Sequence, residues 1–312
     1  MTRTLPMTEP LPDQPDRVTI YEVGPRDGLQ NEKSVVPTQV KAEFVRRLLA
    51  AGLETVELTS FVPQKWVPQL GDAEELMDLL GEEGLGQRRP VLVPNERGLD
   101  RALERGVTSV AIFGSATETF ARKNLNRSVE ESVQMFAPVV KRALDAGAWV
   151  RAYVSMCFGD PWEGPVPVEQ VVDACSRLMD LGCDQLSIGD TIGVGTPGHV
   201  HRLLDALGDA GIGPEQTAVH FHDTYGQALA NTMTAIGDGV RVVDASTGGL
   251  GGCPYARSAT GNLATEDLVW ALDGLGIEHG ADLDALVRTS TWMAEQLGRP
   301  APSRVVKALA GD

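Results

Sequence analysis

Short apolar runs alternate with longer segments of helical periodicity along most of the chain. The apolar runs are rich in β-branched residues and have the length of buried strands. They predict eight strands, at residues 18–23, 55–58, 90–93, 109–113, 149–154, 185–188, 218–221 and 240–244. The segments between them predict helices, among them residues 39–51, 73–80, 128–146, 167–181, 197–210 and 225–237, with a further helix from near residue 262 and a last one at 282–297.

This repeating order predicts one fold class, an α/β (β/α)8 TIM barrel with an additional C-terminal helix. Eight βα units in about 260 residues match the size of such a barrel, and eight parallel strands close a sheet without edges. An open, doubly wound sheet is the alternative, but it usually has fewer strands. We expect a single catalytic domain at residues 17–312. Residues 1–16 contain four prolines and mixed charges, which predicts a flexible tail without a targeting signal.

Composition narrows the classes of partner. The net charge of −16 argues against nucleic-acid binding, because a phosphate backbone needs an excess of basic residues. No apolar run approaches the roughly 20 residues of a membrane span, so no membrane association is expected. Cys157, Cys175, Cys183 and Cys253 show no paired spacing, which predicts reduced thiols and a cytoplasmic protein.

Polar residues follow several predicted strands, and barrel active sites lie at these carboxyl ends. Asp27 follows strand 1, His220 and His222 end strand 7, and Asn262 lies beyond strand 8. Closure places strands 7, 8 and 1 side by side, so these four residues can converge. Their mixed nitrogen and oxygen set suits Mg²⁺ or Mn²⁺ better than a structural zinc. The alternatives are a packed core histidine, a turn aspartate and a helix N-cap at Asn262.

Arg26 is a candidate for binding a carboxylate or a developing oxyanion. We expect it not to pair with Asp27, because neighbouring side chains on an extended segment point apart. The alternative role for Arg26 is an ion pair with the buried acid Glu57, and both roles can hold together. Asp190 ends strand 6 at the same mouth.

Two glycine-rich segments have different interpretations. Gly248–Gly252 with Cys253 predicts a lid over the mouth, although a lone cysteine is more often a small packed residue. The second segment, from Gly193 to Gly198, matches a dinucleotide-binding pattern. It does not directly follow its strand and lacks the accompanying acidic residue, so we interpret it as a loop before a helix that starts at a proline.

Several long motifs resemble the 3-hydroxy-3-methylglutaryl-CoA lyases of the DRE-TIM metallolyase superfamily. They are EVGPRDGLQNEK from Glu22, TSFV from Thr59, GDTIGVGTPG from Gly189, HFHDTYGQALAN from His220 and GLGGCPYA from Gly249. The resemblance extends from about residue 18 to 275, and Asp27, Arg26 and Glu57 match the residues that name the superfamily.

The resemblance implies a lyase that cleaves its acyl-CoA substrate to acetyl-CoA and acetoacetate, as in leucine degradation. Asp27, His220, His222 and Asn262 would hold the cation, which would chelate the substrate hydroxyl and carboxylate. Arg26 would stabilise the enolate oxygen of the thioester. Asp190 and Cys253 would transfer protons, without an assignment of acid and base.

The substrate contacts implied by the same likeness are Arg26, Gln30, Lys33, Ser60, Arg122, Lys123 and Asn124. A homodimer is the expected assembly. Three alternatives stay open: a lyase for a longer 3-hydroxy-3-alkylglutaryl-CoA or another 3-hydroxyacyl-CoA, a Claisen-type condensing enzyme, and an inactive barrel that only binds ligands. Retention of all four cation ligands speaks against the last.

Overall fold

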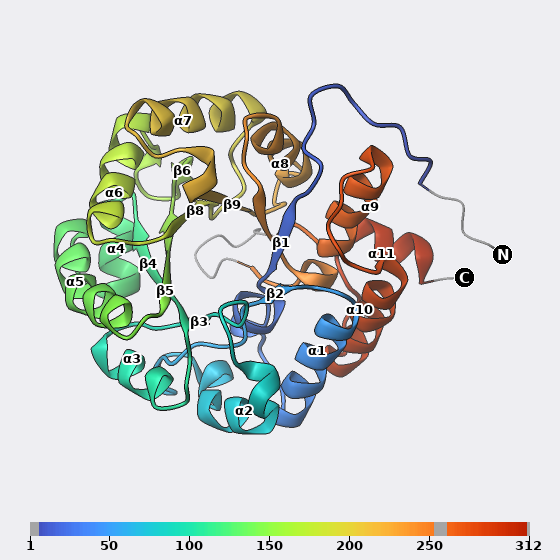
Figure 1. Cartoon of the computed structure of the whole chain (residues 1–312), viewed down its shortest axis with the longest axis horizontal. Coiled ribbons are helices and arrows are strands. Elements are labelled where there is room, and N and C mark those ends of the chain that lie inside the picture. Colours follow the sequence, from blue (N-terminus) through green and yellow to red (C-terminus); the bar gives the residue numbers. More distant parts are fainter. Residues whose placement is uncertain (1–5, 253–260, 311–312) are drawn as a thin grey trace.

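A computed structural model describes residues 6–252 and 261–310, and its centre is a barrel of eight parallel strands (Figure 1). The sheet order is β2-β1-β10-β9-β8-β5-β4-β3, and a bridge between Ser60 and Leu92 joins the two ends. Each of the eight strands corresponds to a predicted run. Their bounds are β1 Thr19–Glu22, β2 Thr55–Val56, β3 Val91–Leu92, β4 Ser109–Ser115, β5 Trp149–Ser155, β8 Gln185–Asp190, β9 Thr217–Phe221 and β10 Val242–Ala245.

Helices surround this barrel, as the predicted βα order requires (Figure 1). They are α1 Thr38–Ala50, α2 Ala73–Leu80, α3 Glu96–Leu103, α4 Glu118–Leu125, α5 Val129–Asp145, α6 Val168–Asp180, α7 Pro197–Asp209, α8 Ala228–Gly237, α9 Thr265–Leu275, α10 Leu283–Leu297 and α11 Arg304–Leu309. The strand β5 is followed by a small hairpin of β6 Gly159–Asp160 and β7 Gly164–Pro165. The α/β barrel with extra C-terminal helices is therefore confirmed.

Local chemistry explains several helix ends. Ser128 and Glu131 form a capping box at the start of α5, and the side chain of Asp282 accepts a hydrogen bond from Ala285 at the start of α10. Pro197 is the first residue of α7, as the sequence predicted. The N-cap alternative for Asn262 is wrong, because α9 begins only at Thr265 and Asn262 instead bridges His222.

The apolar core lies between the strands and the surrounding helices. Parallel pairing puts Ile20 of β1 beside Val243 of β10, and both side chains are buried. Within the described residues, no helix is long and apolar enough to span a bilayer.

Residues near the N-terminus lie against the end of α9. The backbone N–H of Glu9 donates to the carbonyl oxygen of Gly274 at 2.8 Å, and the hydroxyl of Thr8 donates to the carbonyl oxygen of Asp273 at 3.1 Å. The division into a flexible tail and one catalytic domain stays a prediction.

Candidate metal centre

Asp27 enters the mouth of the barrel, the end at which the strands finish, from a tight turn after β1. Residues Gly24–Gly28 form one π-helical turn, η1. A Cβ atom at Gly28 would lie 2.9 Å from Cβ of Leu250 and 2.8 Å from Oγ of Ser246. Glycine therefore lets this turn pack closely on the segment that follows β10.

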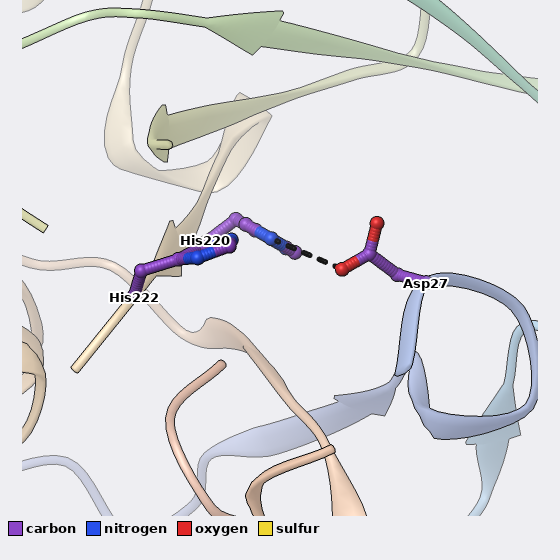
Figure 2. A group of neighbouring side chains, drawn as sticks. All are labelled: Asp27, His220 and His222. Atoms are coloured by element: carbon purple, nitrogen blue, oxygen red, sulfur yellow. Dashed lines mark ion pairs between the residues drawn. The ribbon is translucent and has the colours of Figure 1, made fainter. Parts of the chain in front are cut away.

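His220 and His222 come from the end of β9 and face Asp27 (Figure 2). One ligand atom from each of the three residues lies within 4.8 Å of the others. The distance between His220 Nε2 and Asp27 Oδ2 is 3.9 Å. Because β9, β10 and β1 are neighbours in the sheet, strand order accounts for this convergence of residues far apart in sequence.

Asn262 completes the group through backbone and side chain. Its backbone bridges His222, and its Nδ2 donates to Asp27 Oδ2 at 2.8 Å and to the carbonyl of Leu250 at 3.0 Å. The Oδ1 atom of Asn262 is buried and has no hydrogen-bond partner within residues 6–252 and 261–310. A buried amide oxygen without a donor is available as a fourth ligand to a hard cation.

The electrostatic surroundings keep the Asp27 carboxylate charged. Burial alone would raise the pKa of Asp27, but electrostatic interactions with Arg26, His220 and His222 and the hydrogen bond from Asn262 lower it to about 2. The Nη1 atom of Arg26 lies 2.7 Å from Asp27 Oδ1. Our expectation that these neighbours would not pair is wrong, because residues 24–28 are coiled in a π-helical turn and not extended.

Arg26 is also fixed by Glu57. Its Nε and Nη2 atoms donate to the two oxygens of Glu57 at 3.0 and 3.1 Å, and both side chains are buried. Tyr153 of β5 donates its hydroxyl to Glu57 and places its ring 5.0 Å from the Arg26 guanidinium carbon. This arrangement holds the guanidinium rigidly beside the metal centre.

Asp190 ends β8 and is held by the glycine-rich turn that follows it. The backbone N–H groups of Val194 and Gly195 donate to its two carboxylate oxygens at 3.0 and 2.8 Å. Burial raises the pKa of Asp190 to about 6, although these bonds oppose the rise. Within this described segment, the glycine pattern therefore serves as a cradle for a carboxylate.

The remaining predicted residues are more dispersed. Ser60 is fully buried at the barrel closure, whereas Lys33 and the α4 residues Arg122, Lys123 and Asn124 are exposed, and Gln30 is half-buried. Lys123 lies over the ring of Trp162 at 4.8 Å, and Arg122 pairs with Glu118. Cys253 lies outside the described residues, so its predicted place on the lid stays a prediction.

Two buried carboxylates that the sequence did not single out anchor the base of the predicted lid. Glu22 accepts hydrogen bonds from the N–H and the hydroxyl of Thr247, each at 2.8 Å. Glu266 accepts from the N–H of Gly248 at 2.9 and 3.1 Å, and burial raises its pKa to about 8. Glu22 is the first residue of the family motif that follows strand 1, although no role was assigned to it, and the only sequence signal of Glu266 is its position at the start of the last barrel helix.

Comparison with known proteins adds a family. Residues 17–293 match the HMGL-like family. A mitochondrial hydroxymethylglutaryl-CoA lyase of Arabidopsis thaliana is 49% identical over 95% of this chain, which spans 63% of that longer protein. A cytoplasmic 3-hydroxy-3-methylglutaryl-CoA lyase of Rattus norvegicus is 46% identical over 94% of this chain and 85% of its own length.

Solved structures agree with this similarity. The crystal structure of a hydroxymethylglutaryl-CoA lyase from Pseudomonas aeruginosa has a TM-score of 0.90 and 44% identity, over 96% of this chain and 99% of that one. The structure of an HMG-CoA lyase from Acinetobacter baumannii, in complex with coenzyme A and 3-methylmalate, has a TM-score of 0.87 and 34% identity. The match covers 94% of this chain and 95% of that one.

Proposed function

This chain belongs to the HMGL-like family, and on that premise we propose that it is a divalent-metal-dependent carbon–carbon lyase acting on 3-hydroxy-3-methylglutaryl-CoA. The products are acetyl-CoA and acetoacetate, formed by retro-Claisen cleavage. The observation that carries the proposal is the convergence of Asp27, His220 and His222 beside a fixed Arg26 at the barrel mouth.

The residues present fit a hexacoordinate cation, Mg²⁺ or Mn²⁺. Two imidazoles, one carboxylate and the buried amide oxygen of Asn262 supply four donors and leave positions for substrate oxygens. When bound, such a cation would polarise the tertiary hydroxyl of the substrate and lower its pKa. The low pKa of Asp27 keeps that ligand ionised over the working pH range.

Arg26 is proposed to stabilise the negative charge that develops on the thioester oxygen. Glu57 and Tyr153 hold the guanidinium before the substrate arrives, so little reorganisation is needed during the reaction. Because two of its three nitrogens donate to Glu57 and the third to Asp27, the group is fixed in a single plane. The Nη1 and Nη2 atoms each carry a second N–H, so the guanidinium can donate to the substrate oxygen while these three contacts persist.

Asp190 and Cys253 are proposed to transfer the protons. A pKa of about 6 lets the Asp190 carboxyl group take up or release a proton near neutral pH, which is the range in which general acids and bases are efficient. Cys253 would approach the site on the segment whose base is held by Glu22 and Glu266. The assignment of acid and base between the two is left to kinetics.

The CoA portion is proposed to bind across the exposed cations near the mouth. Lys33 follows the β1 turn, whereas Arg122 and Lys123 lie on α4, and all three are exposed cations on an acidic chain. Gln30, Ser60 and Asn124 are the proposed neutral contacts. We place the protein in the cytoplasm and expect a homodimer; its relatives include cytoplasmic and mitochondrial proteins.

The test is detection of acetoacetate from purified protein and substrate, with and without a chelator. We expect activity that is lost with chelator and restored by Mg²⁺ or Mn²⁺. A parallel assay with a longer 3-hydroxy-3-alkylglutaryl-CoA tests the sister activity. A much higher kcat/KM for the longer substrate would contradict the proposed substrate but not the chemistry.

A further inference from the structure

A layer of polar side chains fills the barrel directly beneath the metal centre. Barrel interiors are usually packed with branched apolar residues. Here Tyr21 of β1, Asp244 of β10, Ser187 of β8 and Arg151 of β5 are each at most 2% exposed. Strand register pairs Asp244 with Tyr21 on one side and with His220 on the other. The polar layer is therefore continuous with a proposed metal ligand.

Asp244 joins this layer to His220. Its Oδ1 accepts from Nη2 of Arg151 at 2.5 Å, and its Oδ2 accepts from the hydroxyl of Ser187 at 2.9 Å. The same Oδ2 lies 3.1 Å from Nδ1 of His220. A carboxylate paired with arginine is only an acceptor, so the facing imidazole nitrogen is the one that carries hydrogen. The other nitrogen, Nε2, lies on the side of Asp27.

Stability alone does not account for this layer. The Nε and Nη1 atoms of Arg151 are buried and have no hydrogen-bond partner in the described part of the chain, although its guanidinium carbon stacks 3.8 Å from the centre of the Tyr21 ring. A buried ion pair with unfilled donors is often no more stabilising than apolar residues of similar volume. The contact with His220 gives the layer a role that apolar residues could not fill.

We propose that Asp244, held by Arg151 and Ser187, is a positioning residue that keeps the hydrogen of His220 on Nδ1 and leaves Nε2 to bind the cation. The proposal rests on the proposed metal centre and adds a residue outside its ligand set. Metal-binding histidines typically depend on such a partner for tautomer and ring orientation, and its loss costs about 10- to 100-fold in metal affinity.

The tautomer can be tested on the wild-type protein. Long-range ¹H–¹⁵N spectra of metal-free protein labelled with ¹⁵N in its five histidines report which nitrogen of each ring is protonated. The signals that disappear in His220→Gln belong to His220. We expect its hydrogen on Nδ1. Hydrogen on Nε2 in the wild type would overturn the proposal, whatever the behaviour of any variant.

Metal affinity gives the second readout, with Mn²⁺ as the probe and its electron paramagnetic resonance signal as the measure of free ion. Asp244→Asn is expected to weaken Mn²⁺ binding by about 10- to 100-fold. Asp72→Asn is the matched control, because Asp72 also pairs with a buried cation, Lys41, and neither residue belongs to the proposed ligand set. That control should stay within about twofold of wild type.

A folded Asp244→Asn protein with wild-type Mn²⁺ affinity would overturn the proposal. If that variant does not fold, Ser187→Ala decides, since it removes one hydrogen bond to Asp244 without a change of charge. A loss of about threefold or more then supports the proposal, and unchanged affinity overturns it. Wild-type protein that binds no Mn²⁺ would instead refute the proposed metal-dependent function, and the tautomer spectrum separates these two failures.

Discussion

Arg26 and Glu57 form a two-bond ion pair at the barrel mouth, with Nε to Oε1 at 3.0 Å and Nη2 to Oε2 at 3.1 Å. The pair crosses from the turn after β1 to the end of β2, and Glu57 is fully buried. Parallel hydrogen bonds of this kind fix both distance and plane. The relationship makes Arg26 at once a structural and a catalytic candidate, and the two roles need separate tests.

Arg26→Gln is expected to lower kcat by about 10²- to 10³-fold, because it removes a charged donor aimed at a developing oxyanion. It also leaves the Glu57 carboxylate buried without its cation, which costs about 3–5 kcal/mol of stability. Steady-state kinetics and denaturant unfolding on the same preparation measure the two effects.

The double variant Arg26→Gln/Glu57→Gln separates these effects. Removal of both charges should return most of the lost free energy of unfolding and leave kcat low. Recovery of activity together with stability would show that Arg26 acts only as a structural partner of Glu57.

Removal of one proposed ligand tests the cation. His222→Ala should lose Mn²⁺ binding and turnover together, because three remaining donors cannot hold the ion in the same geometry. The control is His201→Ala, since His201 is exposed on α7 and pairs with Asp238. Isothermal titration calorimetry with Mn²⁺ measures the binding in both variants. If His222→Ala kept the wild-type affinity for Mn²⁺, the proposed metal site would be wrong.

The sequence predicted the fold well because each strand and each helix has its own local pattern of apolar residues. An apolar run marks every strand of the barrel, and the observed strand ends differ from the predicted ones by at most two residues. Closure and parallel order then place residues 27, 220, 222 and 262 together without further information. The family motifs contain Asp27, His220 and His222, whereas Asn262 lies outside the quoted motifs.

Contacts across the barrel could not be read in this way. Arg151 and Asp244 are 93 residues apart in sequence, and their side chains form a hydrogen bond inside the barrel. Nothing in the sequence around either residue indicates that the other is its partner. The pairing of Arg26 with Asp27 was missed for a different reason, because a π-helical turn gives no periodic signal over five residues. Cross-barrel chemistry depends on shape, which only the folded chain supplies.

Glu266 predicts an unusual pH dependence of stability. Its folded pKa of about 8 lies above its ordinary value of 4.5, so the folded state binds the proton more tightly. The contribution of Glu266 is therefore full below pH 4.5 and is lost as the pH rises through about 8, with a slope on the order of 1.4 kcal/mol per pH unit between these values. Glu266→Gln should flatten this decline in urea unfolding measured from pH 5 to 8.

The control for Glu266 is Glu74→Gln. The hydrogen bond from Arg101 lowers the pKa of Glu74, so this residue does not titrate between pH 5 and 8. The variant should keep the wild-type slope. A Glu266→Gln protein with the same slope as wild type would show that Glu266 stays ionised in the fold.

A pair of glycine substitutions tests how closely the lid base must approach Asn262. A Cβ atom at Gly261 would lie 1.9 Å from the carbonyl oxygen of Gly249, and backbone cannot move aside as a side chain can. Gly208 in α7 has no atom within 4 Å of such a Cβ. Gly208→Ala should therefore stabilise the protein by about 0.4–1 kcal/mol, since alanine restricts the unfolded chain.

Gly261→Ala should destabilise the protein and also weaken Mn²⁺ binding, because the displaced backbone carries Asn262 away from Asp27. Thermal unfolding and Mn²⁺ titration distinguish this from a simple loss of packing: a destabilised Gly261→Ala protein with unchanged Mn²⁺ affinity would mean that Asn262 does not contribute to the cation.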